Sequence, residues 1–539
     1  MMTGAFSPPG PLQELPKASR ESVSVIMFAA ILLFTALVRL PALVAPANLS
    51  QDATEYIDIA RNVAAGEGLT LKIRGYFFGD GYGVPYPSQS LRSPLFPLLM
   101  GFAYRVVPSY HVFQWFNFGL FLINMALLAL LFRATLPPGL AAYALLLAGM
   151  TEPFFLTSIF PWAEQTALVW LLTALLMASA GIHRKWGGAG ALLEGLVCAM
   201  ASLSRPEYLL VGALFLLWLL WRDRCRWEVG VAFLIGFLLP LGIVAGLNYQ
   251  AYGRTFFPGE YLFHSRHYAS YFAWSNSGRA QGTLSFLYEN WVWILGRILR
   301  NAVNYSAKLI GWKNLFLLAL ALPLVLLQAV RGQYDRRKEM LAIAAAAFFC
   351  SYCLIWAGMD RERYLLAVTP FWLPLCLSEA NRLRLEAGRT WVRRASLLVM
   401  AANLPLSVAA VAYAGIRIQE RQAPGERFYA RENPAWSNPD AEKLSAWITA
   451  NLRAGEVLCM ENPFLFNYQT GCIAVVIPEE LEASRLGDFL QDYHVSYFIN
   501  NTVFTRRSPD ALEALERAAW KAGAREAARC GTYRIFRMP

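Results

Sequence analysis

The 539-residue sequence has few charged residues. Only 16% are Asp, Glu, Lys or Arg, whereas about 25% is usual in a soluble domain, and 56% of the chain is hydrophobic. The mean hydropathy is +0.37. Apolar runs of about 20 residues recur along the chain, and each is long enough to cross a hydrocarbon core of roughly 30 Å. The shortage of charge therefore excludes an ordinary soluble protein and indicates a polytopic membrane protein.

The sequence also lacks the motifs of several enzyme classes. It has no GxGxxG, Walker or nucleophile-elbow motif, so nucleotide-driven chemistry has no support. Its 8 cysteines show no metal-ligand spacing. Cys350 and Cys353 form a CxxC inside an apolar run, where small core residues are favoured over a redox pair. His264 and His267 form an HxxH, which is a weak zinc pattern without a third ligand.

The formal net charge of +11 raises the question of a nucleic-acid partner. The Lys and Arg residues, however, cluster in short loops beside apolar runs, where such residues set membrane topology. We therefore expect these basic residues to lie beside a lipid bilayer, and we expect no nucleic-acid partner.

Eleven apolar segments are predicted to span the membrane. They are residues 23–45, 110–132, 139–159, 163–182, 187–203, 208–221, 229–248, 313–330, 340–358, 364–380 and 395–416. Basic residues are abundant in residues 1–22 and in alternate loops, and the short loops on the other side hold only Arg205, Arg361 and Arg363. The positive-inside rule therefore predicts a multi-pass protein of the inner (cytoplasmic) membrane with a cytoplasmic N-terminus.

This topology predicts a disordered cytoplasmic leader, residues 1–22, and a membrane domain, residues 23–416, with outer loops 46–109 and 249–312. The first loop contains a helical segment and then an apolar run, Ser93 to Val107, which is too short to span and is expected to lie in the membrane interface. The second outer loop is rich in Tyr, Trp and His, as is typical at headgroup depth.

Residues 417–539 are predicted to form a small extracytoplasmic α/β domain. Helical patterns cover 438–453, 479–491 and 509–523. Short apolar runs predict strands at Val457–Met460, Ile473–Ile477, Val495–Ile499 and Tyr533–Phe536. The domain holds Cys459, Cys472 and Cys530, so an oxidising compartment allows at most one disulfide within it. The expected fold class is thus a mainly α-helical membrane protein, with about 11 transmembrane helices, that carries this domain.

Asp52 and Glu55 begin the helical segment of the first outer loop. One interpretation is structural: Asp52 as N-cap and Glu55 at the third position match a capping box, with Ser50 as an alternative cap. The functional interpretation makes Asp52 a general base for an acceptor hydroxyl, which requires a carboxylate within reach. Ala53, Tyr56, Ile57 and Ala60 share one face of the helix and are expected to pack against the spans.

Two further acids, Glu152 and Glu164, lie at the outer ends of the third and fourth spans. Carboxylates near hydrocarbon are costly and usually face protein or a watery cavity. Each is either an interfacial charge or a second acid near Asp52 that binds substrate. A divalent cation held by Asp52 and Glu164 is a third possibility, since oxygen ligands suit hard metals.

Several arginines on the outer side are candidates for binding a lipid phosphate. Arg361 and Arg363 oppose the positive-inside trend, and a guanidinium suits phosphate geometry. Arg205 and Arg92 are further candidates. A local surface ion pair between Arg205 and Glu207, worth under about 1 kcal/mol, is the alternative for Arg205. Arg39 is expected to snorkel at the end of the first span.

Taken in order, these motifs resemble the GT-C superfamily of polyprenyl-phosphate-sugar-dependent glycosyltransferases, specifically its bacterial protein-mannosyltransferase-like and aminoarabinose-transferase-like branch. The resemblance covers about residues 23–380. Its positions are Arg39, Asp52 with Glu55 and Tyr56, Ala60, Gly66-Glu67-Gly68, Ser93-Pro94-Leu95, Glu164, Ser204-Arg205-Pro206-Glu207, Asn248 with Gly253, and Arg363-Tyr364 with Pro370.

The resemblance implies an enzyme, a hexosyl- or pentosyltransferase that moves a sugar from a polyprenyl-phosphate donor to an envelope glycolipid, polysaccharide or protein acceptor. Asp52 corresponds to the acid of the first outer loop, and Glu164, with Glu152 in reserve, to the second acid. Many family members have two adjacent acids at the first site, whereas Ala53-Thr54 separate Asp52 from Glu55 here. The implied reaction is a single displacement with inversion, in which cationic groups hold the departing lipid phosphate.

Two other functions compete with this one. A flippase or transporter of lipid-linked sugars would favour discontinuous helices with charges near the midplane, whereas the charges here lie near the span ends. A non-catalytic envelope receptor would use the outer domain to bind a partner.

Overall fold

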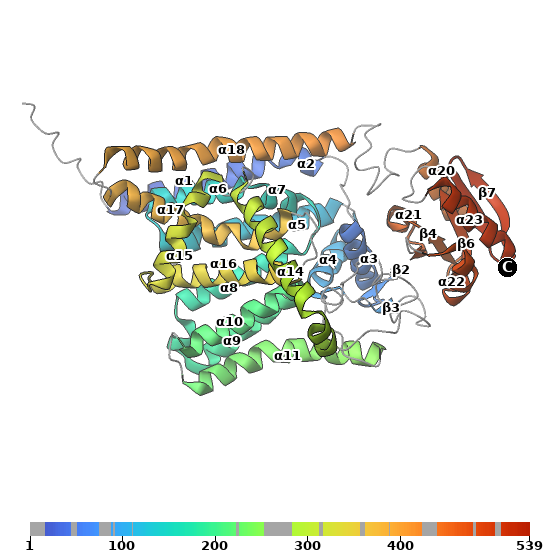
Figure 1. The fold of residues 1–539 in the computed structure, drawn as a ribbon, viewed down its shortest axis with the longest axis horizontal. Helices are drawn as coiled ribbons and strands as arrows, with labels where there is room; N and C mark the ends of the chain where they lie inside the picture. Colours follow the sequence, from blue (N-terminus) through green and yellow to red (C-terminus); the bar gives the residue numbers. More distant parts are fainter. Residues whose placement is uncertain are drawn as a thin grey trace, which may run out of the picture.

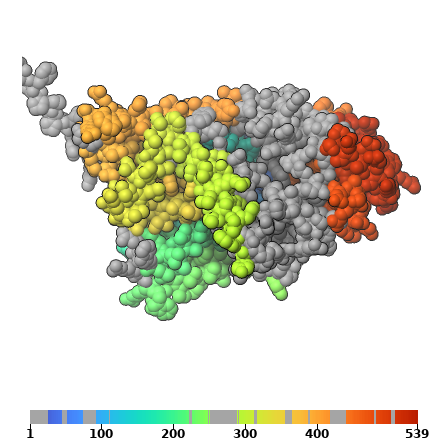
Figure 2. Space-filling model, in the orientation of Figure 1, coloured from blue at the N-terminus to red at the C-terminus, as the bar shows by residue number. Residues whose placement is uncertain are grey.

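The computed structural model describes residues 17–44, 51–74, 88–89, 92–109, 111–221, 226–252, 283–311, 316–355, 362–386, 389–422, 439–477, 481–501 and 508–539. These residues form a bundle of helices with a C-terminal α/β unit at one end (Figure 1). The surface view shows the C-terminal unit at the same end of the molecule (Figure 2). His264, His267 and Arg361 lie outside the described residues.

The first helices of the bundle are broken at two places. The chain passes from α1 (Lys17–Leu37) to α2 (Leu40–Val44) through a turn that contains Arg39. After α5 (His111–Thr135), the helices α6 (Pro138–Gly149) and α7 (Glu152–Ile159) meet at 58°. Pro153 favours this break, because a proline fits the first turn of a new helix but not the interior of a continuous one. The helix α1 begins inside the leader predicted for residues 1–22.

The next helices pack closely. Their order is α8 (Glu164–Ser179), α9 (Ile182–Ser204), the 3₁₀ turn η1 (Pro206–Tyr208), α10 (Leu209–Trp221) and α11 (Trp227–Tyr252). Two glycines permit the contact between α9 and α11. A Cβ atom on Gly195 would lie 2.1 Å from the Phe233 carbonyl oxygen, and one on Gly236 would lie 2.1 Å from the Leu192 carbonyl oxygen. Only glycine therefore lets these two backbones approach so closely.

The second half of the bundle contains a helix that the sequence did not predict. Its elements are α14 (Thr283–Ile310), η3 (Phe316–Ala321), α15 (Leu322–Val330), α16 (Arg336–Ile355), η4 (Glu362–Ala367), α17 (Thr369–Glu386) and α18 (Thr390–Gln422). The unpredicted helix, α14, falls in the segment 249–312 that was expected to be an outer loop. It is amphipathic: Arg297, Asn301 and Tyr305 are buried, whereas Tyr288 and Trp291 are exposed. Its polar residues break up the apolar run by which a span is recognised.

Each of the eleven predicted spans overlaps at least one of these helices. Among the described residues, four helices are long and apolar enough to cross a membrane, and the bent pair α6–α7 would make a fifth. Shorter apolar helices account for other predicted spans. The apolar run that was expected to be too short to span forms another such helix, α4 (Leu95–Val106). The count of eleven spans stays a prediction.

The C-terminal unit is a six-stranded sheet with helices on both faces. The strand order is β2-β5-β4-β6-β8-β7; the pairs from β2 to β6 are parallel and the last two are antiparallel. The strands predicted from the sequence are β4 (Val457–Met460), β5 (Ile473–Val476), β6 (Val495–Asn501) and β8 (Tyr533–Arg537), and β7 (Arg525–Cys530) was not predicted. The helices are α20 (Pro439–Asn451), α21 (Phe464–Thr470), α22 (Leu486–Asp492) and α23 (Pro509–Lys521), with the 3₁₀ turn η6 (Ala483–Arg485).

One edge of this sheet comes from the first outer loop. Strand β2 (Ile73–Arg74) pairs in parallel with β5, and the Ala474 N–H donates to the Lys72 carbonyl at 3.0 Å. The loop also contains α3 (Gln51–Ala65) and a small ladder of β1 (Thr70–Leu71) with β3 (Ser88–Gln89). The first outer loop and the C-terminal unit are thus one packed structure, although the chain between them is long.

None of the seven described cysteines, which include Cys459, Cys472 and Cys530, forms a disulfide. The disulfide that an oxidising compartment would allow is therefore not formed among these three.

Candidate functional site

Helix α3 presents two carboxylates at its N-terminal end. It begins at Gln51, so Asp52 lies within its first turn. The prediction that Asp52 is the N-cap of a capping box is therefore wrong, because an N-cap precedes the first helical residue. Negative charge is favourable in this turn, where backbone N–H groups carry partial positive charge. The predicted apolar face, with Ala53 and Ile57, is buried against α4.

Arg92, just before α4, holds both acids. Its Nε donates to Glu55 Oε2 at 2.6 Å, and its Nη2 lies 2.6 Å from the same oxygen and 3.0 Å from Asp52 Oδ1. The side chain of Glu55 is 3% exposed, whereas those of Asp52 and Arg92 are 20% and 21% exposed. Arg92 is thus anchored on a buried acid and also contacts an acid that solvent reaches.

A second arginine, Arg205, lies between two buried acids. Its Nη1 lies 2.7 Å from Glu164 Oε1, and its Nη2 donates to Glu207 Oε1 at 2.7 Å. All three side chains are less than 10% exposed. The pair of Arg205 and Glu207 expected at the surface is therefore present but buried, and Glu164 joins it. A buried charge depends on its partners far more than a surface charge does, so the estimate of under about 1 kcal/mol does not apply.

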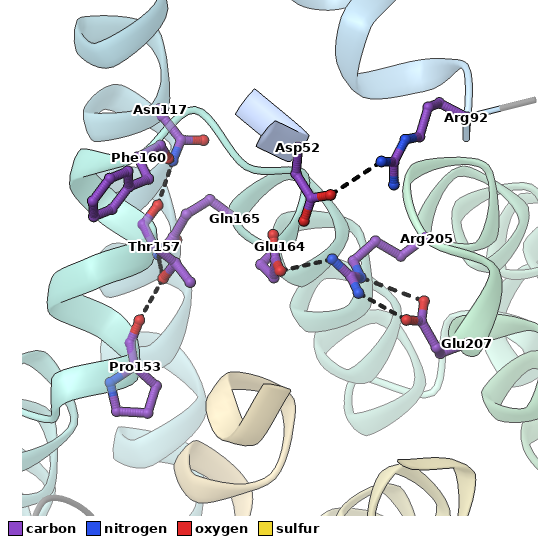
Figure 3. Close-up of polar contacts among 10 residues, drawn as sticks. All are labelled: Asp52, Arg92, Asn117, Pro153, Thr157, Phe160, Glu164, Gln165, Arg205 and Glu207. Carbon is purple, nitrogen blue, oxygen red and sulfur yellow. Dashed lines mark hydrogen bonds and ion pairs between the residues drawn. The ribbon is translucent and has the colours of Figure 1, made fainter. Parts of the chain in front are cut away.

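The two arginine–acid groups form one polar centre. Figure 3 shows Asp52 directed toward Glu164 and Arg205, with Arg92 on its other side. Burial raises the pKa of the Tyr56 hydroxyl, and charges from both groups act on it, namely Arg92, Arg205, Asp52 and Glu164. Since one side chain senses both groups, the first outer loop and the turn after α9 contribute to the same centre.

A buried amide network supports the turn that leads to Glu164. Asn117 on α5 donates to the carbonyl oxygens of Thr157 and Phe160, which belong to the unsatisfied C-terminal end of α7 (Figure 3). Gln165 donates to the Thr157 hydroxyl at 2.8 Å and accepts from Asn124 at 2.7 Å. The residue next to Glu164 is therefore fixed on both sides, which fixes the start of α8.

Two solved structures share this architecture. AglB, the archaeal oligosaccharyltransferase from Archaeoglobus fulgidus in complex with an inhibitory peptide and a dolichol-phosphate, matches with a TM-score of 0.55 and 14% identity over 88% of this chain and 69% of its own. ArnT from Cupriavidus metallidurans, bound to undecaprenyl phosphate, matches with a TM-score of 0.54 and 14% identity over 97% of this chain and 98% of its own. No protein-family model and no curated protein sequence matches the chain.

The chain therefore shares the fold of AglB and ArnT. At 14% identity the likeness extends to the fold and not to individual residues, so the roles of residues depend on this chain's own geometry.

Among the predicted site residues, Glu164 is the acid that lies beside Asp52 (Figure 3). Glu152 is buried in the first turn of α7. The length of this helix, eight residues or about 12 Å, separates Glu152 from the turn that leads to Glu164. Arg363 belongs to η4, and the ring of the next residue, Tyr364, lies 5.3 Å from the Arg205 guanidinium carbon. The η4 turn therefore lies against the polar centre.

Arg39 does not snorkel, contrary to the prediction. It is fully buried, donates to the Ser158 hydroxyl at 2.8 Å and to the carbonyl oxygens of Thr35 and Gly149, and covers the Phe121 ring at 4.0 Å. These acceptors lie where α1 ends and where α6 ends, so breaks in the helices free the carbonyls that Arg39 satisfies. Arg39 therefore connects the end of α1 to the end of α6.

The acids of the polar centre do not fit a divalent cation well. Glu164 already contacts Arg205 and Asp52 contacts Arg92, and a metal ion would have to displace or repel these guanidinium groups. No group of three or more His, Cys, Asp or Glu that could hold a metal occurs among the described residues. No step of the reaction is therefore assigned to a metal.

The far end of α3 carries a contact with the C-terminal unit that the sequence analysis missed. Asp58, 1% exposed, accepts from the Lys72 N–H at 2.6 Å, and burial raises its pKa to about 6. Arg61 donates to the Tyr468 carbonyl at 2.7 Å and lies over its ring. The i, i+3 spacing of Glu55 and Asp58 was the available signal, since it places both acids on one side of the helix. The C-terminal unit therefore helps to fix the helix that bears Asp52.

Proposed function

We propose that this GT-C chain is a membrane glycosyltransferase that moves a sugar from a polyprenyl-phosphate donor to an envelope glycolipid, polysaccharide or protein acceptor. The observation that carries the proposal is the half-buried carboxylate of Asp52, which lies beside Arg92 and faces the buried group of Glu164 and Arg205. The fold supports it, because the two similar structures hold dolichol-phosphate and undecaprenyl phosphate. No nucleotide is needed, since the phosphate ester supplies the leaving group.

In the proposed reaction Asp52 is the general base. The acceptor hydroxyl oxygen attacks the anomeric carbon from the side opposite the lipid phosphate, so the new C–O bond forms as the bond to the phosphate oxygen breaks. The phosphate leaves with the electron pair, the hydroxyl proton passes to the Asp52 carboxylate, and the anomeric configuration inverts. A positioned base of this kind contributes about 10²–10⁴-fold.

The arginines divide into two roles. Arg205 is enclosed by Glu164 and Glu207, so its charge holds Glu164 in place rather than binding the donor. Arg92 reaches solvent and is our candidate for the phosphate oxygens, with Arg361 and Arg363 as further candidates on and before η4. Developing negative charge on the leaving phosphate would strengthen such contacts in the transition state.

A transporter is the second function to be tested. The break between α6 and α7 is a feature that a transporter would have. Here, however, Arg39 donates to the Gly149 carbonyl at the break and to the Ser158 hydroxyl of α7, which favours a fixed scaffold.

The test is transfer by the purified protein from a radiolabelled polyprenyl-phosphate sugar to an envelope glycolipid extract. We expect Asp52→Asn to lose at least about 100-fold of the activity. Glu513→Gln is the control, because Glu513 forms an exposed pair in the C-terminal unit, 3.9 Å from Arg517. Equal rates for Asp52→Asn and the unmutated protein would refute the assignment of the base.

The proposed location is the inner membrane, with the N-terminus cytoplasmic and the C-terminal unit periplasmic. Cysteines introduced at positions 270 and 450 should react with a membrane-impermeant thiol reagent added from outside the inner membrane. Reaction from the cytoplasmic side alone would overturn this orientation, and with it the placement of the active site.

A further inference from the structure

We propose that Arg92 exchanges Asp52 for the phosphate group of the lipid donor, so that donor binding releases the carboxylate that acts as base. This inference rests on the proposed function and adds how the same site is controlled. It makes Arg92 a substrate-binding residue whose contact with Asp52 belongs to the state without donor.

The two contacts of Arg92 are unequal. Toward Glu55 it uses both Nε and Nη2, each at 2.6 Å, and Glu55 is almost fully buried. Toward Asp52 it uses Nη2 alone at 3.0 Å, and the Asp52 side chain is 20% exposed. The contact with Asp52 is single, longer and partly open to solvent, so it is weaker than the two-point contact with Glu55, and a phosphate that reaches Arg92 would displace Asp52 first. The contact with Glu55 keeps the guanidinium in place during the exchange.

The exchange would change which group the Asp52 carboxylate can contact. While Asp52 Oδ1 accepts from Arg92, that oxygen is directed at a cation and not at an acceptor hydroxyl. When a phosphate takes the guanidinium, Oδ1 no longer accepts from Arg92 and can accept from an acceptor hydroxyl. The donor phosphate carries one negative charge as a diester and gains negative charge when it leaves as a monoester, so its attraction to Arg92 increases along the reaction.

Arg205, the other arginine of the polar centre whose contacts are described, does not offer the same exchange. Arg205 is 9% exposed, and its charge is shared between Glu164 and Glu207, so a phosphate there would have to separate a buried triad. Of the two described acids that Arg92 contacts, Asp52 is the one that solvent reaches, so a phosphate would compete with Asp52 rather than with Glu55.

The experiment is a double-mutant cycle on the binding of undecaprenyl phosphate to the purified full chain in nanodiscs, measured by native mass spectrometry without an acceptor. Removing the competing charge with Asp52→Asn should tighten binding about fivefold. Arg92→Gln should weaken binding by about fivefold or more. In the Arg92→Gln background, Asp52→Asn should change the affinity less than about twofold, because the shared guanidinium is gone.

Controls separate this competition from a general charge effect. Glu513→Gln removes one exposed negative charge from the C-terminal unit and should leave the affinity unchanged. Undecaprenol, which lacks the phosphate, should bind Asp52→Asn and the unmutated protein equally. Arg92→Lys keeps the charge, and Asp52→Asn should still tighten binding in that background, which keeps the test valid if Arg92→Gln misfolds.

An unchanged affinity for Asp52→Asn, or the same tightening with and without Arg92, would overturn the exchange. The cycle needs no turnover, so it is distinguishable from the test of the proposed function. If the protein shows the coupling but transfers no sugar, the proposed transferase activity is refuted and the exchange at Arg92 is supported. If it transfers sugar without the coupling, the transferase activity is supported and the exchange is refuted.

Discussion

The carboxylate of Asp58 accepts a hydrogen bond from the backbone N–H of Lys72 at 2.6 Å, which ties the third helix to the strand that enters the C-terminal sheet. Burial raises the pKa of Asp58 from 3.8 to about 6. Between these values the folded protein binds a proton that the unfolded chain has lost, so the stability falls as the pH rises from about 4 to about 6. The loss is on the order of 3 kcal/mol for this group.

Hydrogen exchange at the amides of β2 and β5 should therefore become faster over that pH interval, after correction for the intrinsic rate. Asp58→Asn cannot titrate and should remove this pH dependence while keeping an oxygen to accept from Lys72. A variant that retains the full pH dependence would show that another group causes it.

Arg205 should contribute more to stability than either of its acidic partners. Arg205→Leu leaves Glu164 and Glu207 as two buried carboxylates without a cation, a change expected to cost about 3–5 kcal/mol. Glu164→Gln leaves a neutral pair of Arg205 and Glu207, so its cost should be smaller. Thermal unfolding of the purified variants in detergent measures the difference; equal losses would contradict the bridging role of Arg205.

Two glycines of α11 provide a matched test of helix packing. A Cβ atom at Gly236 would lie 2.1 Å from the Leu192 carbonyl oxygen, whereas one at Gly242 meets no atom within 4 Å. Gly236→Ala should lower stability by at least about 1–3 kcal/mol through overpacking. Gly242→Ala should be neutral or stabilise by up to about 1 kcal/mol, since alanine favours the helix. Similar melting temperatures for both variants would be inconsistent with the close contact between α9 and α11.

The buried Arg39 should not be replaceable by lysine. Arg39→Lys keeps the charge, but a single ammonium group cannot reach the Ser158 hydroxyl and the carbonyls of Thr35 and Gly149 in the same planar arrangement. We expect losses of about 2–4 kcal/mol for both Arg39→Lys and Arg39→Ala, measured by thermal unfolding. A lysine variant as stable as the unmutated protein would show that only the charge matters.

The sequence was sufficient to predict the broad fold because hydrophobic runs and loop charges report directly on membrane segments. It was also sufficient for four strands of the C-terminal sheet, whose residues are buried on both faces. Helix α14 was missed because its buried polar face, with Arg297 and Asn301, keeps its sequence from resembling a span. Strand β2 is only two residues long, and no local pattern identifies it.

The site shows a similar limit. Asp52 and Glu164 were identified as a pair of acids, but their partners depend on contacts between distant segments. Arg205 was assigned to phosphate or to a surface pair, and nothing in its local sequence reveals that Glu164, about 40 residues earlier, encloses it. Arg39 was assigned to the membrane surface because a lone arginine near a span end usually lies there; the helix breaks that supply its acceptors are visible only in three dimensions.

The parallel pairing of β2 with β5 has a consequence for biogenesis. Ile73 pairs with Ala474, about 400 residues further along the chain, so this contact must wait until almost all of the protein has been made. At typical rates of about 5–20 residues per second, the first outer loop remains without its partner strand for roughly 20–80 s. During that interval the exposed edge of the loop is open to incorrect pairing. Pairing with the C-terminal strands is therefore the step that completes the protein, and a chain truncated before residue 473 would carry every residue of the polar centre and still lack its final support.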